Sequence, residues 1–527
     1  MAQVNTSPGE PAFRPFGSRW WRRFLVCLGA LAALAGAFYA EEDWRGHRDW
    51  GLYRQAAEAR GEPLEFRAYI PKLVPDEENF AEAPVVKTWL QLDLDPIFTN
   101  DFYARADYHV YPTNSTKSTG HRHFADLVAW QMAFSALQTG ELQPDQHFAT
   151  DKMDPQSRAE AAPAVLEGLK SDEPVFTALR LASARKYSRF PLQYDREDPA
   201  LILMAHHAKI RVVCERLSLQ VCAELAAGQT DKALADEKLM LYLADAIKEE
   251  PFLISFLVRD GWFQVAIPPV REGLAEHRWT ELQLKELQSS FQHDNFLADA
   301  DQSLKAERAY QLQEMEQVKK QGLGYLYVNL AVKDAFGQLS RILNLFGRIM
   351  PAGWMDQERL NYCTLFDLQL KGAMDLAEGR VFPRQIALNE AELNRKLPPG
   401  ASLSAFVRSV LHHQVIADGR VEVLGKLPGI AATLQTTANQ TAIACALEMY
   451  RLANGHFPET LSVLTPQFMS RLPNDVITGQ PYKYRLTGDG QFILYSVGWN
   501  EKDDGGVPGK RRFDDQEGDW VWDYTAS

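Results

Sequence analysis

The pattern of apolar and polar positions is most distinctive near the start of the chain. Residues 24–40 read FLVCLGALAALAGAFYA and contain no charged side chain. About 17–25 apolar residues cross the hydrocarbon core of a bilayer as a helix, so this run predicts a single transmembrane helix. Arg19, Arg22 and Arg23 precede the run. Because basic flanks stay in the cytoplasm, we expect residues 1–23 to be cytoplasmic and the bulk of the chain to be extracytoplasmic.

A cleaved signal peptide is the alternative interpretation of the same segment. Ala35, Gly36 and Ala37 fit the small-residue rule for a cleavage site, and the apolar run is only slightly long for a signal peptide. Trp20 and Tyr39 lie near the two ends of the run, where aromatic rings prefer the membrane interface. We therefore favour an uncleaved anchor.

Prolines punctuate residues 41–120, and their density prevents long helices apart from a short one near residues 50–60. This composition predicts a Pro-rich stalk that packs along the next domain.

Residues 121–425 have the periodicity of a large helical domain. Apolar positions from Ile210 to Leu225 recur at steps of three and four residues, Gly228 follows, and a second stripe runs from Ala233 to Ile247. Two such helices joined by a short glycine turn form an αα-hairpin. Thr280 and Gln283 have the spacing of a capping box before a further helix. An irregular helical bundle fits better than a repeat array, because no clean 34-residue period is present.

Residues 428–527 have a different pattern, which predicts a small α+β domain with an antiparallel sheet. A helix is expected from Pro428 to Ala453, since Asn454-Gly455 is a helix-stop signal. Two β-type runs, at 482–486 and 491–497, are separated by Thr-Gly-Asp-Gly, which is typical of a β-hairpin. An acidic, glycine-rich tail follows.

Composition excludes several classes of protein. The 527 residues include 56 basic and 69 acidic side chains, a net charge of −13 that argues against a nucleic-acid partner. With 46% apolar and 24% charged residues, the chain has an ordinary globular composition. Five cysteines are too few for a disulfide framework in a chain of this length.

The C-terminal motifs resemble the globular head of the major pseudopilin of type II secretion. The matching pieces, in order, are Ala446-Leu447-Glu-Met-Tyr450, Asn454-Gly455-His-Phe457-Pro458, Leu472-Pro473-Asn-Asp475, Gly479-Gln-Pro481-Tyr482, Tyr495-Ser496-Val-Gly498 and Asp504-Gly505-Gly506. The resemblance covers about 85 residues, and the layout of the whole chain also resembles large uncharacterised bacterial envelope proteins. One departure is that the apolar run lies far upstream of the head, whereas in a pseudopilin it continues directly into the head helix.

The pseudopilin resemblance implies a calcium loop after the last matching strand. Calcium prefers six to eight oxygen ligands, which a loop rich in Asp, Asn and carbonyl groups can supply. The corresponding positions are Asn500, Asp503, Asp504, Asp514 and Asp515. Asn500 stands where the family usually has Asp, and a solvated acidic turn is the alternative interpretation.

Signals for catalysis are weak. The histidine pairs 121/123, 206/207 and 412/413 are interpreted as surface or capping residues, since neighbours on a helix point about 100° apart. Ser183 and Lys186 match a Ser-x-x-Lys pattern whose companion motifs are absent. Cys214 and Cys363 lie on helical stripes and are expected to be buried. Four C-terminal aromatic residues are expected to pack a small sheet: Trp499, Trp520, Trp522 and Tyr524.

These observations predict a protein of the bacterial inner membrane, anchored by residues 24–40, with a helical domain and an α+β head outside the cytoplasm. We expect a non-enzymatic structural or adaptor role, with a protein partner on the helical domain and a link to a type II secretion or pilus-like system. The alternatives are an envelope hydrolase acting on peptidoglycan or glycan, and a calcium-dependent structural module.

Overall fold

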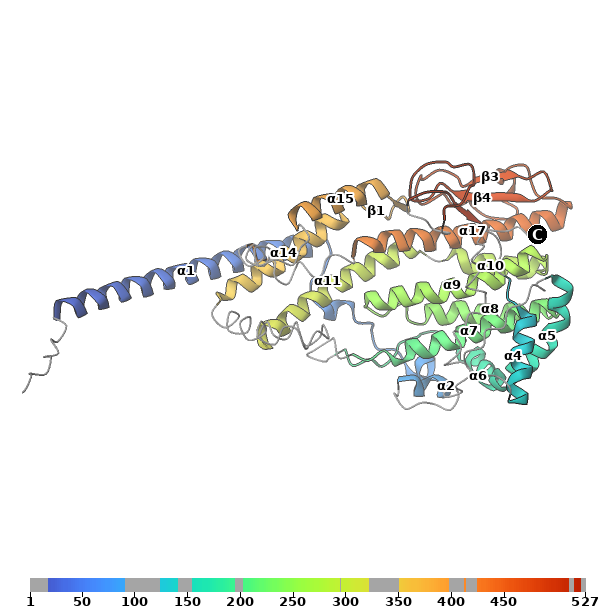
Figure 1. Ribbon diagram of the computed structural model, residues 1–527, viewed down its shortest axis with the longest axis horizontal. Helices are drawn as coiled ribbons and strands as arrows, with labels where there is room; N and C mark the ends of the chain where they lie inside the picture. The colour runs from blue at the N-terminus through green and yellow to red at the C-terminus, as the bar shows by residue number, and fades with distance from the viewer. Residues whose placement is uncertain are drawn as a thin grey trace, which may run out of the picture.

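A computed structural model describes residues 18–90, 124–140, 154–194, 202–293, 295–321, 350–397, 412–413, 424–510 and 516–522. The architecture is mainly helical, with two small antiparallel sheets in the C-terminal third of the chain. One long helix, α1, projects from an elongated body made of the other elements (Figure 1). The predicted fold class is therefore confirmed at the level of a mainly helical chain with one apolar N-terminal helix.

Helix α1 runs from Ser18 to Ala59 without a break. The predicted boundary at residue 40 marks the end of the apolar run but not the end of the helix. The physical reason is that residues 41–59 contain no proline, the first one being Pro63. The helix therefore continues from its apolar part into the body.

The proline-rich segment after α1 folds into short 3-10 turns and one helical turn, which pack against the body. These elements are η1 (Phe66–Tyr69), η2 (Asp76–Glu78), η3 (Phe80–Glu82), α2 (Pro84–Lys87) and η4 (Thr88–Leu90). Phe66, Phe80 and Trp89 are buried in the main core. Residues 91–120 of the predicted stalk lie outside the described residues.

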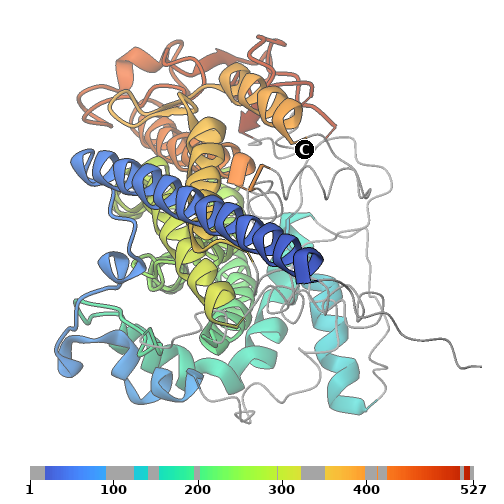
Figure 2. The ribbon, with the colours of Figure 1, turned by 90° about the vertical axis from the view of Figure 1, so that its left-hand side faces the viewer.

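The helices of the body lie in layers seen in Figures 1 and 2. They are α4 (Leu127–Thr139), α5 (Pro155–Leu169), α6 (Glu173–Ala182), α7 (Ala205–Ala226), α8 (Thr230–Asp245), α9 (Leu253–Ala275), α10 (Glu281–Gln292), α11 (Phe296–Gln321), α14 (Ala352–Leu370), α15 (Pro383–Lys396) and α17 (Leu427–Asn454). Short 3-10 turns η5 (Lys170–Asp172) and η7 (Leu424–Lys426) lie between them, and η8 (Leu461–Leu464) follows α17.

Several helix ends follow the sequence signals. Gly228 has a φ of +75° in the turn between α7 and α8, which pack together as the predicted αα-hairpin. The capping box before α10 is present, with Thr280 and Gln283 bonding each other's backbone N–H groups. Gly455 ends α17 with a φ of +82°. These predictions are confirmed.

The C-terminal sheet is antiparallel and ordered β3 (Lys483–Leu486), β4 (Phe492–Ser496), β5 (Trp520–Trp522). The strands β3 and β4 form the predicted hairpin, with Tyr484 opposite Leu494. A separate two-stranded ribbon joins β1 (Met374–Asp375) to β2 (Arg380–Val381). Trp520 and Trp522 are buried, and Trp499 stacks on Trp520 with ring centroids 6.3 Å apart. Three of the four C-terminal aromatic residues thus pack the sheet region, and Tyr524 lies outside the described residues.

Helix α17 lies between the C-terminal sheet and the helices α9, α10 and α11 (Figure 1). Every residue from Gln440 to Met449 is buried, so α17 is covered on all sides there. One continuous core contains α17, the sheet and most of the helices before it, whereas α4 and α5 pack in a second, smaller core with one face of α7. The predicted boundary at residues 425–428 therefore does not separate two cores, because α17 supplies apolar side chains to both neighbours.

Candidate functional site

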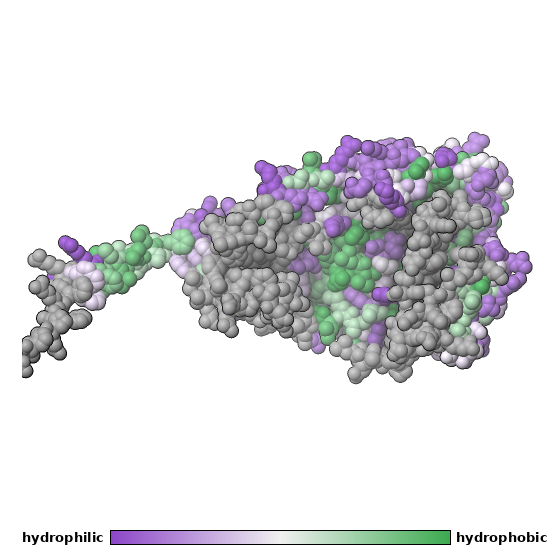
Figure 3. Space-filling view, viewed as in Figure 1, coloured by the Kyte–Doolittle hydropathy of each residue, from purple (hydrophilic) through white to green (hydrophobic). Residues whose placement is uncertain are grey.

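The first candidate site is the apolar part of α1, which is exposed and meets the body at its end, where Phe38 lies edge-on to Trp354. Among the described residues, α1 is the one helix that is long and apolar enough to cross a membrane, judged by length and composition. None of its most apolar window is buried, and Leu34 is 68% exposed. Figure 3 shows this stretch as a hydrophobic rod outside the body. Exposed apolar side chains over such a length require a non-aqueous environment or a partner.

Directly after the apolar run, α1 is joined to the first turn of α14. Glu42 is only 7% exposed, and its carboxylate accepts hydrogen bonds from Trp354 Nε1 at 2.9 Å and Gln357 Nε2 at 3.3 Å. Asp43 Oδ1 accepts from the backbone N–H of Gly353 at 2.8 Å. These carboxylates lie where the N-terminus of α14 carries partial positive charge, so the contact is electrostatically favourable.

The two helices cross at a pair of glycines. A Cβ atom added to Gly46 would lie 2.2 Å from the carbonyl oxygen of Gly353. A Cβ added to Gly353 would lie 2.3 Å from the carbonyl oxygen of Glu42. Only the absence of side chains allows the backbones to approach this closely. We call this contact, formed by Glu42, Asp43, Gly46, Gly353 and Trp354, the anchor junction.

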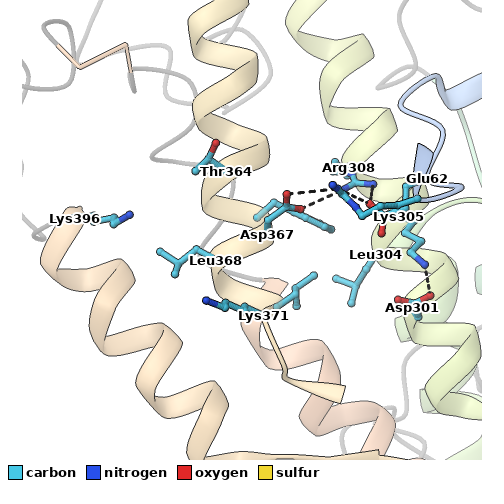
Figure 4. A pocket seen from close by; sticks show the side chains of 13 residues that line it. Glu62, Asp301, Leu304, Lys305, Arg308, Thr364, Asp367, Leu368, Lys371 and Lys396 are labelled. Carbon is cyan, nitrogen blue, oxygen red and sulfur yellow. Dashed lines mark hydrogen bonds and ion pairs between the residues drawn. The ribbon is translucent and has the colours of Figure 1, made fainter. Parts of the chain in front are cut away.

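A second set of contacts ties the end of α1 to the body beside a cavity of about 510 Å³ (Figure 4). Arg308 is 1% exposed and donates to Glu62 at 3.0 Å and to Asp367 at 3.2 Å. Tyr53 donates to Asp367 at 2.8 Å. Burial alone would raise the pKa of Glu62, but hydrogen bonds from Arg308 and Arg60 outweigh it and hold the pKa below its usual value. The hydrogen bond of Tyr53 and the ion pairs of Arg308 therefore link α1 and the residues just after it to α11 and α14.

The predicted calcium positions do not gather into a common ligand set among the described residues. Asp503 accepts from Tyr495 Oη at 2.9 Å and pairs with Lys483 at 3.1 Å, while Asn500 donates to Asp504 at 3.0 Å. Buried Asp519, which was not predicted, accepts from the backbone N–H groups of residues 504 and 506. Asp514 and Asp515 lie outside the described residues. The calcium site stays a prediction.

The interpretation of the histidine pair at 206 and 207 as surface or capping residues is wrong. His206 is fully buried and His207 is 8% exposed. His206 Nε2 lies 2.6 Å from Glu250 Oε1, and His207 Nε2 lies 2.9 Å from Glu250 Oε2. Adjacent histidines on a helix point apart, but each ring here reaches a different oxygen of one carboxylate. We call these three residues the His–His–Glu cluster.

Aromatic rings and a serine hold the cluster in place. Phe190 stacks on His206 with ring centroids 4.0 Å apart, and Trp262 meets His207 edge-on at 5.9 Å. Ser255 Oγ donates to Glu250 Oε2 at 2.6 Å. Among the described residues, the His–His–Glu cluster is the one group of potential metal ligands whose ligand atoms all lie within 4.8 Å of one another.

Burial and hydrogen bonding act in opposite directions on the cluster. Burial would raise the pKa of Glu250, but hydrogen bonds from both histidines outweigh it and lower the pKa to about 2. Burial lowers the pKa of His206 despite its bond to Glu250. Glu250 is therefore ionised at neutral pH and His206 is neutral. No local motif could have revealed this cluster, since Glu250 lies 44 residues from His206 in the sequence.

The remaining candidates have structural roles or lie elsewhere. Ser183 Oγ donates to the carbonyl oxygen of Arg180, as a residue at a helix end does. Cys214 and Cys363 are buried, as predicted. His413 packs against Trp354 with ring centroids 4.8 Å apart, which places it at the anchor junction rather than free on the surface. Residues 121 and 123 lie outside the described residues.

Comparison with known proteins yields no relative. No protein-family model matches the chain, and neither a curated protein nor a solved structure matches it. The pseudopilin resemblance therefore rests on the C-terminal sequence motifs alone, and function has to be inferred from the residues and their arrangement.

Proposed function

We propose that the protein is a membrane-anchored structural or adaptor protein of the bacterial envelope, with its body on the extracytoplasmic side of the inner membrane. The observation that carries the proposal is the two-part nature of α1. Its apolar part is exposed along its length, and its remaining part is docked on α14 through the anchor junction. An anchor that continues as a rigid part of the body would fix the distance and angle of the body to the membrane.

The proposed orientation of α1 in the membrane rests on the charged residues at the two ends of its apolar run. Arg19, Arg22 and Arg23 precede the apolar run, and Glu42 and Asp43, which follow it, are both engaged by α14. The excess of basic residues before the run supports a cytoplasmic N-terminus. The link to a type II secretion or pilus-like machine is supported by the order of the C-terminal motifs, and the helical body would present the surface for a protein partner.

An anchor-exchange experiment tests the adaptor role against an enzyme role. In one variant a cleavable signal peptide replaces residues 1–40, so that the body is released in soluble form. In a matched control an unrelated transmembrane segment of equal length replaces residues 24–40. If the protein is an adaptor held at the membrane, only the control should correct the defect of a strain that lacks the protein. Restoration by the released body, at equal abundance and melting temperature, would contradict the proposal.

The fate of the anchor is checked on the mature protein. Intact mass spectrometry of the membrane-extracted protein should give the full 59.6 kDa chain, within ordinary loss of the initiator methionine. A chain shortened by about 37 residues would show that the segment is a signal peptide. Resistance to extraction by alkaline carbonate gives an independent measure of membrane integration.

An envelope hydrolase is the second candidate, and the His–His–Glu cluster is the observation that favours it. Catalytic groups commonly have shifted pKa values, as Glu250 and His206 do. The lining of the cavity in Figure 4 comes from other residues, however, so the cluster does not open into that cavity. A peptidoglycan zymogram that compares wild type with Glu250→Gln decides: activity lost in the variant would favour the hydrolase.

A further inference from the structure

The His–His–Glu cluster goes beyond the anchoring role, because its three side chains are arranged as metal ligands. Two imidazole nitrogens and one carboxylate converge from two elements, the first turn of α7 and the segment between α8 and α9. All three side chains are buried. We propose that His206, His207 and Glu250 hold a divalent transition metal of the zinc class.

The distances need only a small adjustment to admit the ion. Zinc bonds of about 2.0–2.2 Å at tetrahedral angles place the ligand atoms about 3.3 Å apart. The two nitrogen-to-oxygen distances in the cluster are 2.6 and 2.9 Å. Lengthening these two contacts by about 0.7 and 0.4 Å, and closing up the widest separation of at most 4.8 Å, converts the two hydrogen bonds into metal bonds.

The residues around the His–His–Glu cluster limit how its three side chains can move. Stacking on Phe190 and edge-on contact with Trp262 hold the planes of the two imidazoles. The hydroxyl of Ser255 orients the carboxylate, as the outer partners of metal ligands commonly do. The His207 side chain is 10% exposed, so His207 is the member of the cluster nearest to solvent.

The charge of the cluster also favours a cation. Glu250 is 7% exposed, and a buried carboxylate is costly unless its charge is compensated. An imidazole that binds a metal ion does so in its neutral form, so the two histidines bring no positive charge of their own to the carboxylate. A divalent ion supplies that charge.

The donor set selects the class of metal. Imidazole nitrogen with one carboxylate suits zinc, cobalt, nickel and iron, whereas calcium and magnesium take oxygen ligands. Three protein ligands also leave one position of a tetrahedral ion for water. The cluster is therefore distinct in chemistry from the calcium loop expected near residue 500.

The test uses the full-length protein in detergent, stripped of metal with a chelator and titrated with cobalt(II) chloride. We expect one cobalt per chain, the intense visible absorption of a four- or five-coordinate ion, displacement by zinc, and a higher melting temperature with metal than without. His207→Gln and Glu250→Gln should each weaken cobalt binding by more than about 100-fold, since even outer partners of metal ligands contribute about 10–100-fold. His293→Gln, which changes an exposed histidine, is the matched control and should bind as wild type does.

Three results would overturn the metal site. The first is a wild-type protein that binds no cobalt and melts at the same temperature with and without metal. The second is unchanged binding in the folded His207→Gln and Glu250→Gln variants. If those variants do not fold, X-ray absorption of the wild-type zinc complex decides: two imidazoles without sulfur support the site, and sulfur or purely oxygen ligation rejects it.

Discussion

Glu42 and Trp354 meet at the point where the apolar part of α1 ends. The indole Nε1 of Trp354 donates to the Glu42 carboxylate at 2.9 Å, although 312 positions separate the two residues in the chain. Glu42 is nearly buried at this contact. A charged residue that follows an exposed apolar helical segment is ordinarily solvated, whereas here its carboxylate accepts hydrogen bonds from another helix. The anchor and the body therefore form one unit.

The glycine crossing gives a sharp test of the anchor junction. Gly353→Ala places a methyl group 2.3 Å from the backbone of Glu42, so the helices must separate. We expect a loss of about 1–3 kcal/mol in the free energy of unfolding, as for other overpacked contacts, measured by denaturant titration in detergent. Gly51→Ala is the matched control: it lies in α1 with nothing within 4 Å, and should be neutral or slightly stabilising.

The hydrogen bond itself can be measured by a double-mutant cycle. Glu42→Ala and Trp354→Phe each remove one partner of the hydrogen bond, and the double variant isolates the interaction between them. Because a charged acceptor strengthens a hydrogen bond, we expect a coupling energy of about 1.5–3 kcal/mol. A coupling energy near zero would show that Glu42 and Trp354 do not hold the junction together.

Buried Arg308 tests the second contact between α1 and the body. Arg308→Met leaves the carboxylates of Glu62 and Asp367 without their shared partner. Arg308 is buried but Glu62 and Asp367 are 21% and 39% exposed, so we expect a loss of about 1.5–3 kcal/mol, as for hydrogen bonds to charged groups, and a lower temperature of thermal unfolding. Lys305→Met is the control, since its pair with Asp301 is about one-third exposed and should contribute about 0–1 kcal/mol. Equal changes in melting temperature for Arg308→Met and Lys305→Met would contradict the role of Arg308 in joining α1 to the body.

The sequence predicted those parts of the fold that depend on neighbouring residues. The α7–α8 hairpin, the capping box at Thr280 and the β3–β4 turn each follow from residues a few positions apart. The anchor junction and the His–His–Glu cluster depend on contacts between distant segments. Nothing in the local sequence of α1 indicates that Glu42 is a ligand for α14, and a pattern of spacing cannot show that Glu250 approaches two histidines.

Buried Glu237 predicts a dependence of stability on pH. Both of its carboxylate oxygens are buried without a hydrogen-bond partner. Burial, with a further contribution from the charge of Asp236, raises the pKa of Glu237 well above its usual value. A raised pKa in the folded state means that its contribution to stability is present below about pH 4.5 and is lost as the pH rises toward the folded value.

Glu237→Gln removes this titration. The variant should therefore gain stability relative to wild type as the pH is raised from about 5 to 8, at about 1.4 kcal/mol for each pH unit over which only the unfolded carboxyl ionises. Melting curves across that range provide the measurement. Glu286→Gln, at a partly exposed site paired with Lys238, should follow wild type. If the melting temperatures of Glu237→Gln and wild type change with pH in the same way, the buried carboxyl of Glu237 does not have a raised pKa.

The most direct test of membrane anchoring with an external body is protease accessibility in a bacterial host. Protease is added to intact spheroplasts that express the full-length chain, and fragments are followed with one antibody to the C-terminal segment and one to residues 1–17. The account predicts that the body is digested without lysis while the N-terminal epitope remains protected with the membrane. A body that is digested only after the membrane is opened would contradict it.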